Sequence, residues 1–106
     1  MRLPSPKDAR GHEQQGARYA VVVQDNAFQA LSTVIVAPTS RSARPASFRP
    51  EIEVMGELTR VMVEQLRAVD AQRLSRTVDH LTPEELWDVD SALALMLGLP
   101  FTSYRR

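Results

Sequence analysis

The sequence predicts a mainly β fold, a small antiparallel barrel or curled sheet with one C-terminal helix and one or two short helices. Short β-branched or alternating runs, each ended by proline, glycine or polar residues, fill most of the chain, and one amphipathic helix pattern follows them. With 106 residues the chain can bury one core but not two. We therefore expect a single domain over 1–106, irregular over 1–9 and with a tail over 100–106.

The first half of the chain holds two predicted strands. Residues 1–16 are rich in proline, glycine and charge, so we expect extended chain or loop there. Residues 18–24 contain three consecutive valines, which is typical of a strand covered on both faces. A second strand over 33–37 is expected to stop at Pro38, and a long loop rich in serine, arginine and proline follows over 40–50.

The middle of the chain predicts two more strands and a short extended piece. Residues 51–55 alternate glutamate with apolar side chains, the pattern of a half-exposed strand, and 56–57 supply a turn. Residues 60–68 alternate less cleanly and predict the next strand. The aspartate that opens 70–76 can cap one or two helical turns, and 77–80 should be extended.

A capped helix is the clearest local signal. Thr82 can act as the N-cap, Pro83 suits the first helical position, and Glu85 stands where a capping box needs it. Gly98 suits the residue past the helix end. The apolar residues recur at helical spacing and are Leu86, Val89, Leu93, Met96 and Leu97.

The charges balance overall but are unevenly placed. Thirteen basic and thirteen acidic residues cancel, so a nucleic-acid site would have to be local. Residues 41–49 hold three arginines and no acid, whereas 82–90 hold four acids and no base. The loop is either a solvated basic segment or one wall of a basic groove, and the acidic run is a solvated helix face.

Composition also limits the chemistry. The absence of cysteine excludes disulfides, thiolate nucleophiles and cysteine-bound metals. His12 and His80 are remote in sequence and neither has an acidic cluster beside it, so we expect no metal and no cofactor, and a structural role for His80. No apolar run is long enough to span a bilayer, so we expect a soluble, cytoplasmic protein without a membrane partner.

A series of motifs carries a family resemblance. The run RGHEQQGARYAVVVQDN over 10–26 places a polar loop and an arginine directly ahead of a predicted strand. It is followed by IVAPTS over 35–40, by VEQLRAVD and QRL within 63–74, and by LTPEEL over 81–86. From about residue 10 to 99 the chain resembles the MazF/PemK family of bacterial toxins, which are metal-independent ribonucleases.

The resemblance implies both a fold and an activity. It implies an SH3-like barrel of the CcdB/PemK kind that forms a homodimer and is neutralised by a cognate antitoxin. The implied activity is sequence-selective cleavage of single-stranded mRNA, with the substrate's own 2′-hydroxyl as nucleophile. The family's catalytic pair corresponds by position to Arg18 and Thr39. A guanidinium suits the phosphorane because it is always charged and presents a fork of donors.

Further residues match the family's RNA-binding positions. They are Arg10, His12, Glu13, Gln14, Ser40, Arg41, Glu64 and Gln65. Glutamate and glutamine at such positions can bind the base edges of unpaired nucleotides. The predicted site residues also have plainer structural roles. These are a solvated loop around His12, a strand edge at Glu64 and Gln65, a turn at Thr39, and a solvent-exposed arginine at position 18.

Two departures from the family pattern concern the N-terminal part. Only residues 1–3 remain of the family's hydrophobic first strand. If that strand is absent, 21–23 should lie nearer a sheet edge. Tyr19 stands where the family generally has proline. Two other functions therefore stay open: a catalytically degenerate binding protein of this fold, directed at antitoxin or gyrase, and a subunit that docks through its basic loop. The C-terminal residues 104–106 lack the aromatic tripeptide on which gyrase poisons depend.

Overall fold

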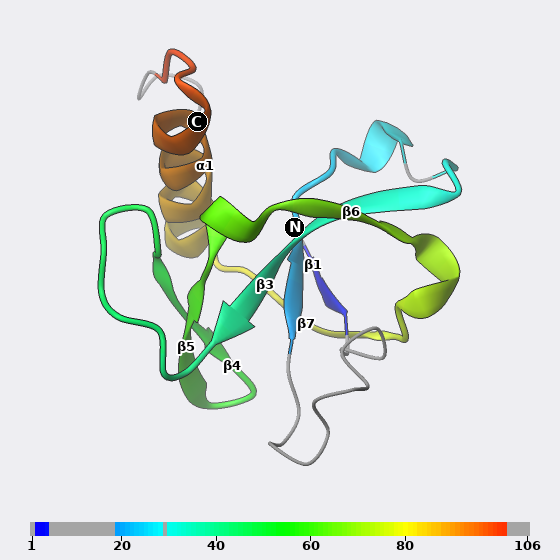
Figure 1. The fold of residues 1–106 in the computed structure, drawn as a ribbon. Coiled ribbons are helices and arrows are strands. Elements are labelled where there is room, and N and C mark those ends of the chain that lie inside the picture. Colours follow the sequence, from blue (N-terminus) through cyan, green and yellow to red (C-terminus); the bar gives the residue numbers. More distant parts are fainter. Residues whose placement is uncertain (1, 5–18, 29, 102–106) are drawn as a thin grey trace.

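The computed structural model describes residues 2–4, 19–28 and 30–101 (Figure 1). The strands are β1 (Arg2–Pro4), β2 (Ala20–Val22), β3 (Thr33–Ser40), β4 (Glu51–Val54), β5 (Glu57–Val61), β6 (Arg67–Asp70) and β7 (Thr77–His80). One helix, α1 (Pro83–Leu97), follows them, and single 3-10 turns occur at η2 (Asn26–Phe28), η3 (Val63–Gln65) and η4 (Ala71–Arg73). This confirms the predicted class, a mainly β chain with one C-terminal helix. No helix in the described ranges has the length and apolarity that a membrane crossing requires.

The strands form one curled antiparallel sheet. Its strand order is β4-β5-β3-β2-β1-β7, and β6 pairs with β3 away from this path. The long strand β3 crosses the middle of the molecule and pairs with β2 along one side (Figure 1). Along its other side it pairs first with β6 and then with β5, so β3 organises the whole sheet.

The N-terminal residues keep a short first strand. Strand β1 pairs with β2 through Arg2 and Val22, and on its other side it pairs with β7. Strand β2 therefore lies between β1 and β3, so the condition under which 21–23 would approach a sheet edge, the absence of a first strand, is not met. A strand this short can still pair on both sides, because successive residues direct their backbone groups to opposite neighbours. The prediction that β2 is covered on both faces is confirmed, since the adjacent Ala20 and Val21 are both buried.

Strand β3 continues through Pro38, where the sequence predicted its end. Pro38 has no N–H to donate, and it stands where β3 passes from β6, paired up to Val36, to β5, paired from Thr39. The missing donor therefore falls between two ladders. The Pro38 carbonyl still accepts a hydrogen bond of 2.8 Å from the Met62 amide.

The predicted strand over 60–68 is wrong, because two strands and a turn occupy this region. Strand β5 pairs with the end of β3, and β6 pairs with its beginning. Both strands run antiparallel to β3, so the chain keeps its direction between them, and the 3-10 turn η3 takes up the residues that separate the two ladders. The β4–β5 hairpin turns at Met55 and Gly56, one residue earlier than predicted. Both have positive φ, 51° and 84°, as a two-residue type I′ turn requires.

Three further local predictions are confirmed. In β4 the glutamates are exposed while Ile52 and Val54 are buried. The Asp70 side chain accepts from the Gln72 amide at the start of η4. Helix α1 has the full capping box and ends at Gly98, whose φ is 69°.

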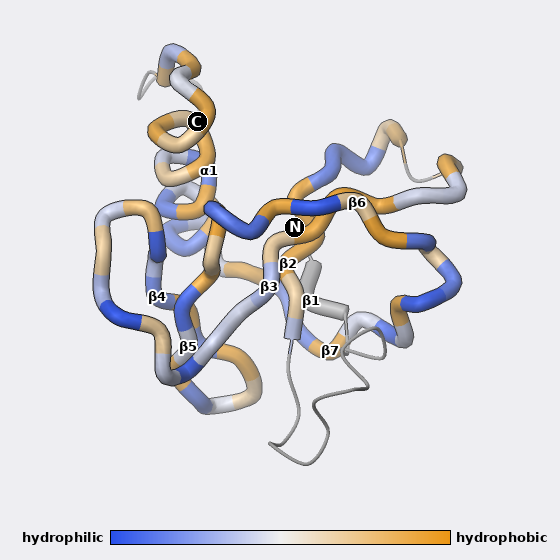
Figure 2. Tube along the Cα trace, in the orientation of Figure 1, coloured by the Kyte–Doolittle hydropathy of each residue, from blue (hydrophilic) through white to orange (hydrophobic). Residues whose placement is uncertain are grey.

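The core lies between the sheet and one face of α1. Figure 2 shows apolar residues where β2, β3 and β6 cross, and mostly polar residues around the outer turn at η4. The fully buried cluster consists of Val21, Ala37, Ile52, Val54, Val61, Val63, Val89 and Ala92. Within α1, Val89 and Leu93 pack on this cluster, whereas Met96 and Leu97 remain exposed. The apolar face of the helix is therefore only partly used by the core.

Candidate functional site

The structure covers half of the predicted site residues. Arg10, His12, Glu13, Gln14 and Arg18 lie outside the described residues, and their roles stay predictions. The other predicted residues are described and come from three elements. They are Thr39 and Ser40 in β3, Arg41 just after it, and Glu64 and Gln65 in η3.

Thr39 is a buried strand residue, with 4% of its surface exposed. Its backbone N–H and its hydroxyl both donate to the carbonyl oxygen of Tyr19, at 3.0 and 2.7 Å. The turn alternative for Thr39 is therefore wrong. Tyr19 directly follows Arg18 in the sequence, so these bonds fix the main chain beside the predicted catalytic arginine. Because its hydrogen points at a carbonyl, the Thr39 oxygen faces other groups as an acceptor.

The turn η3 brings Glu64 and Gln65 beside this end of β3. The bond from the Met62 amide to the Pro38 carbonyl joins the start of the turn to the residue before Thr39. Gln65 is exposed, whereas the Glu64 side chain is 22% exposed. Two sequence segments that resemble the family separately thus meet at one place in the fold.

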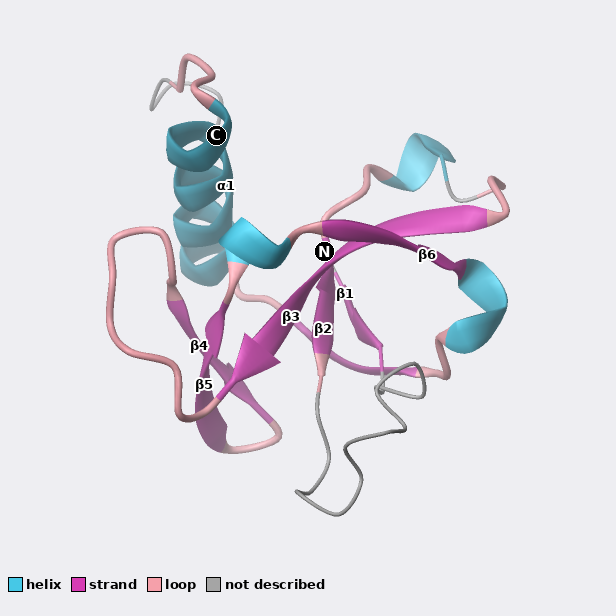
Figure 3. Cartoon of the chain, in the orientation of Figure 1, coloured by secondary structure: helices cyan, strands magenta, loops and turns pink. Residues whose placement is uncertain are grey.

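Ser40 ends β3, and Arg41 begins the loop that joins β3 to β4, drawn in pink in Figure 3. The hydroxyls of Ser40 and Ser42 lie 3.2 Å apart within hydrogen-bond distance, and the Ser42 amide donates to Ser40 Oγ. Arg41 Nη1 donates to Glu57 Oε1 at 2.9 Å. Both side chains of this ion pair are about three-fifths exposed, at 59% and 61%. Solvent-exposed pairs of this kind hold a loop only weakly.

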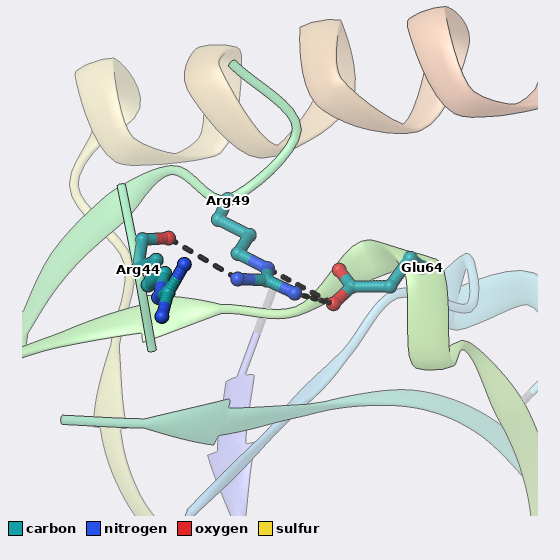
Figure 4. Close-up of polar contacts among 3 residues, drawn as sticks. All are labelled: Arg44, Arg49 and Glu64. Atoms are coloured by element: carbon teal, nitrogen blue, oxygen red, sulfur yellow. Dashed lines mark hydrogen bonds and ion pairs between the residues drawn. The ribbon is translucent and has the colours of Figure 1, made fainter. Parts of the chain in front are cut away.

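A second ion pair near the site was not predicted from the sequence. Arg49 Nε and Nη2 both donate to Glu64 Oε2, at 2.9 and 2.6 Å, and Arg49 Nη1 donates to the Arg44 carbonyl at 3.2 Å (Figure 4). Phe48 covers one face of the guanidinium, 5.3 Å from its ring centre. The positive charge of the basic 41–49 loop is thus partly neutralised by acids from η3 and β5.

The environment of Glu64 favours its charged form. Burial by itself raises the pKa of Glu64, but hydrogen bonds from Arg49 and from its own backbone, with the charge of Arg49, more than offset it. The net result is a lowered pKa. Glu64 Oε1 is buried and has no partner among the described residues. The carboxylate is therefore committed to Arg49 through one oxygen.

These groups form a polar edge. It offers an oriented hydroxyl oxygen at Thr39, an exposed amide at Gln65 and the serine hydroxyls at the start of the loop. In the described ranges, no three histidine, aspartate or glutamate side chains gather as a set of metal ligands.

Comparisons with known proteins place the chain in a family. The family model described as the PemK-like, MazF-like toxin of type II toxin-antitoxin systems matches residues 2–97. The proposed toxin Rv3098A of Mycobacterium tuberculosis is 47% identical over 91 residues, which cover 85% of this chain and 85% of that protein.

Solved structures share the fold. The Mycobacterium tuberculosis toxin MazF-mt6 has a TM-score of 0.78 at 13% identity, over 95% of this chain and 100% of that chain. An endoribonuclease from a mycobacterial species, solved in complex with its cognate antitoxin, has a TM-score of 0.75 at 17% identity and covers 95% of each chain. At these identities the structures show the fold alone, whereas the family model and the 47% identical relative show family membership. The chain belongs to the PemK-like, MazF-like toxins of type II toxin-antitoxin systems.

Proposed function

We propose that this toxin is a metal-independent, sequence-selective endoribonuclease that cleaves single-stranded mRNA in the cytoplasm. The observation that carries the proposal is the pair of bonds from Thr39 to the Tyr19 carbonyl. They fix the main chain beside Arg18 with a buried, oriented hydroxyl. Family membership and a likeness in fold to an endoribonuclease support the same activity.

The proposed reaction uses the RNA's own 2′-hydroxyl. Its oxygen loses its proton to water and forms a bond to the adjacent phosphorus, while the bond from phosphorus to the 5′-oxygen breaks. The 5′-oxygen gains one proton from water and leaves as a hydroxyl, so the protons balance. Arg18 would stabilise the extra charge of the phosphorane. Thr39 would accept a hydrogen bond from the 2′-hydroxyl and hold it in line. Gln65 would read a base edge.

A cleavage assay in EDTA tests this proposal. We expect purified protein to cut mixed-sequence RNA, leaving a 2′,3′-cyclic phosphate or 3′-phosphate and a free 5′-hydroxyl. Arg18→Ala should lower the rate roughly a hundredfold or more, as loss of one preorganised donor does. Products with 5′-phosphates, or activity only with added magnesium, would contradict the mechanism. Unchanged cleavage by Arg18→Ala would remove this residue from it.

The proposal extends to assembly with an antitoxin and with a second copy. One structural relative was solved with its cognate antitoxin. The end of α1 leaves Leu95, Leu97 and Leu99 more than half exposed, at 61%, 53% and 57%. An apolar surface of this kind on a small chain is typical of an interface. We expect a homodimer by light scattering at micromolar concentration, and a monomeric mass would contradict it.

A further inference from the structure

The three arginines of the 41–50 loop differ in what they bind. Arg41 pairs with Glu57, and Arg49 pairs with Glu64. The exposed guanidinium of Arg44 has no partner among the described residues, although its carbonyl accepts from Arg49. Arg44 is therefore the cation of this loop whose charge the described acids leave uncompensated.

The main chain at Arg44 accepts one hydrogen bond, from Arg49. Arg49 donates two hydrogen bonds to Glu64 and a third to the Arg44 carbonyl (Figure 4). The side chains of the pair are only 23% and 22% exposed, so its charge-assisted bonds are better shielded from water than those of Arg41 and Glu57. We name this pair the Arg49–Glu64 clamp. It holds the main chain of Arg44, from which the Arg44 side chain extends.

The clamp lies next to the candidate catalytic residue. Arg60 Nη1 donates to the Arg49 carbonyl at 2.9 Å. In the β3–β5 ladder Arg60 stands opposite Ser40, the residue after Thr39. A continuous series of contacts therefore leads from Thr39 through the ladder and the clamp to Arg44.

We propose that Arg44 binds a phosphate of the RNA strand next to the cleaved one, and that the Arg49–Glu64 clamp positions it. This inference rests on the proposed function, because it takes RNA as the ligand. Arg44 is then a binding residue, and Arg49 and Glu64 are positioning residues that act through it. A guanidinium held by its main chain loses less freedom on meeting a phosphate, which favours binding.

The first test is the salt dependence of binding to a single-stranded RNA with 2′-O-methyl sugars, which lacks the attacking hydroxyl. On single strands the logarithm of the binding constant falls by about 0.7 per neutralised phosphate for each tenfold rise in salt. Arg44→Ala should reduce this slope by about 0.7 and weaken binding equally for different sequences. The matched control is Arg76→Ala, which removes an exposed arginine between η4 and β7. Figure 1 shows the segment between η4 and β7 on the opposite side of the molecule from the 41–50 loop.

The control decides between a specific contact and general charge. We expect Arg76→Ala to keep the wild-type slope. An equal reduction in both variants, or none in Arg44→Ala, would overturn the assignment of Arg44. Absence of binding by the wild-type protein would overturn it as well. Binding that depends on Arg44 without any cleavage of unmodified RNA would uphold the phosphate contact while the proposed ribonuclease activity fails.

The second test compares the direction in which two substitutions change the affinity for RNA. Glu64→Gln and Glu57→Gln each remove one negative charge that faces the same loop. General electrostatics predicts tighter RNA binding for both variants. If the clamp positions Arg44, Glu64→Gln should bind RNA more weakly than wild type while Glu57→Gln binds equally or more tightly. Tighter binding by Glu64→Gln would overturn the clamp. An unchanged denaturation midpoint from Trp87 fluorescence would confirm that the variant stays folded.

Discussion

The sheet is held together differently at β3 and at β4. Around Thr39, main-chain ladders join β3 to β2 and β5. The side chains bonded across the β2–β3 pairing, the Thr39 hydroxyl and the Gln24 amide, are both neutral. At the outer edge of β4, carboxylates take the place of a neighbouring strand. Glu85 Oε2 accepts from the Glu53 amide at 2.8 Å, and Asp79 Oδ2 accepts from the Met55 amide at 3.2 Å.

The two carboxylates link the ends of the sheet path. Asp79 belongs to β7, the last strand of that path, and Glu85 belongs to the first turn of α1. A curled sheet that does not close by main-chain pairing can thus protect its exposed edge with side chains. We call the pairing of β3 with β2 and β5 the β3 seam. Its stability should be insensitive to ionisation, whereas the stability of the β4 edge depends on two charged groups.

The largest expected effect is at Glu85, which has two tasks. Its Oε1 accepts from the Thr82 amide in the capping box, while its Oε2 bonds to β4. Glu85→Ala removes both contacts, so the free energy of unfolding should fall by about 1–2 kcal/mol. Urea denaturation followed by the fluorescence of Trp87, the single tryptophan, measures it.

The neighbouring Glu84 provides the control for this prediction. It is exposed in the same first turn of α1. Glu84→Ala should lose only the favourable interaction with the helix dipole, about 0.3–1 kcal/mol. If Glu85→Ala were no more destabilising than Glu84→Ala, the carboxylate bridge to β4 would have no role in stability.

Two buried threonines test the β3 seam. Thr39 and Thr59 are 4% and 5% exposed. The Thr39 hydroxyl is bonded to Tyr19, whereas Thr59 Oγ1 has no partner among the described residues. Thr39→Val should therefore cost about 0.5–1.5 kcal/mol, and Thr59→Val should be neutral or stabilising. Equal losses in the two variants would show that the bond to Tyr19 contributes nothing particular.

The β4 edge also shows which parts of the fold the sequence predicts. Helix α1 was predicted from its cap to its end because Thr82, Glu85 and Gly98 act within one turn of the helix ends. The passage of β3 through Pro38 could not be predicted in this way. It depends on two partner strands that meet β3 at different places, and proline normally marks a strand end.

The candidate site was predicted unevenly for the same reason. The resemblance selected Thr39, and the structure adds the bond to Tyr19, a contact across 20 residues. The ion pair of Arg49 and Glu64 joins residues 15 apart in sequence. Nothing local separates Arg49 from Arg41, since both lie in one basic loop, and only the fold decides which acid each one meets.

The smallest expected effect is the pH dependence at Asp79. Hydrogen bonds from the backbone amides of Met55 and His80 lower the pKa of Asp79 from its ordinary value of 3.8. The folded state thus favours the ionised carboxylate, so its contribution to stability is fully present above pH 3.8 and is lost as the pH falls through the lowered value. The stability difference between wild type and Asp79→Asn should therefore shrink on acidification. The difference between wild type and Thr39→Val should stay constant over the same range, because a hydroxyl does not titrate there. Parallel pH profiles for the two variants would remove the contrast between the β3 seam and the β4 edge.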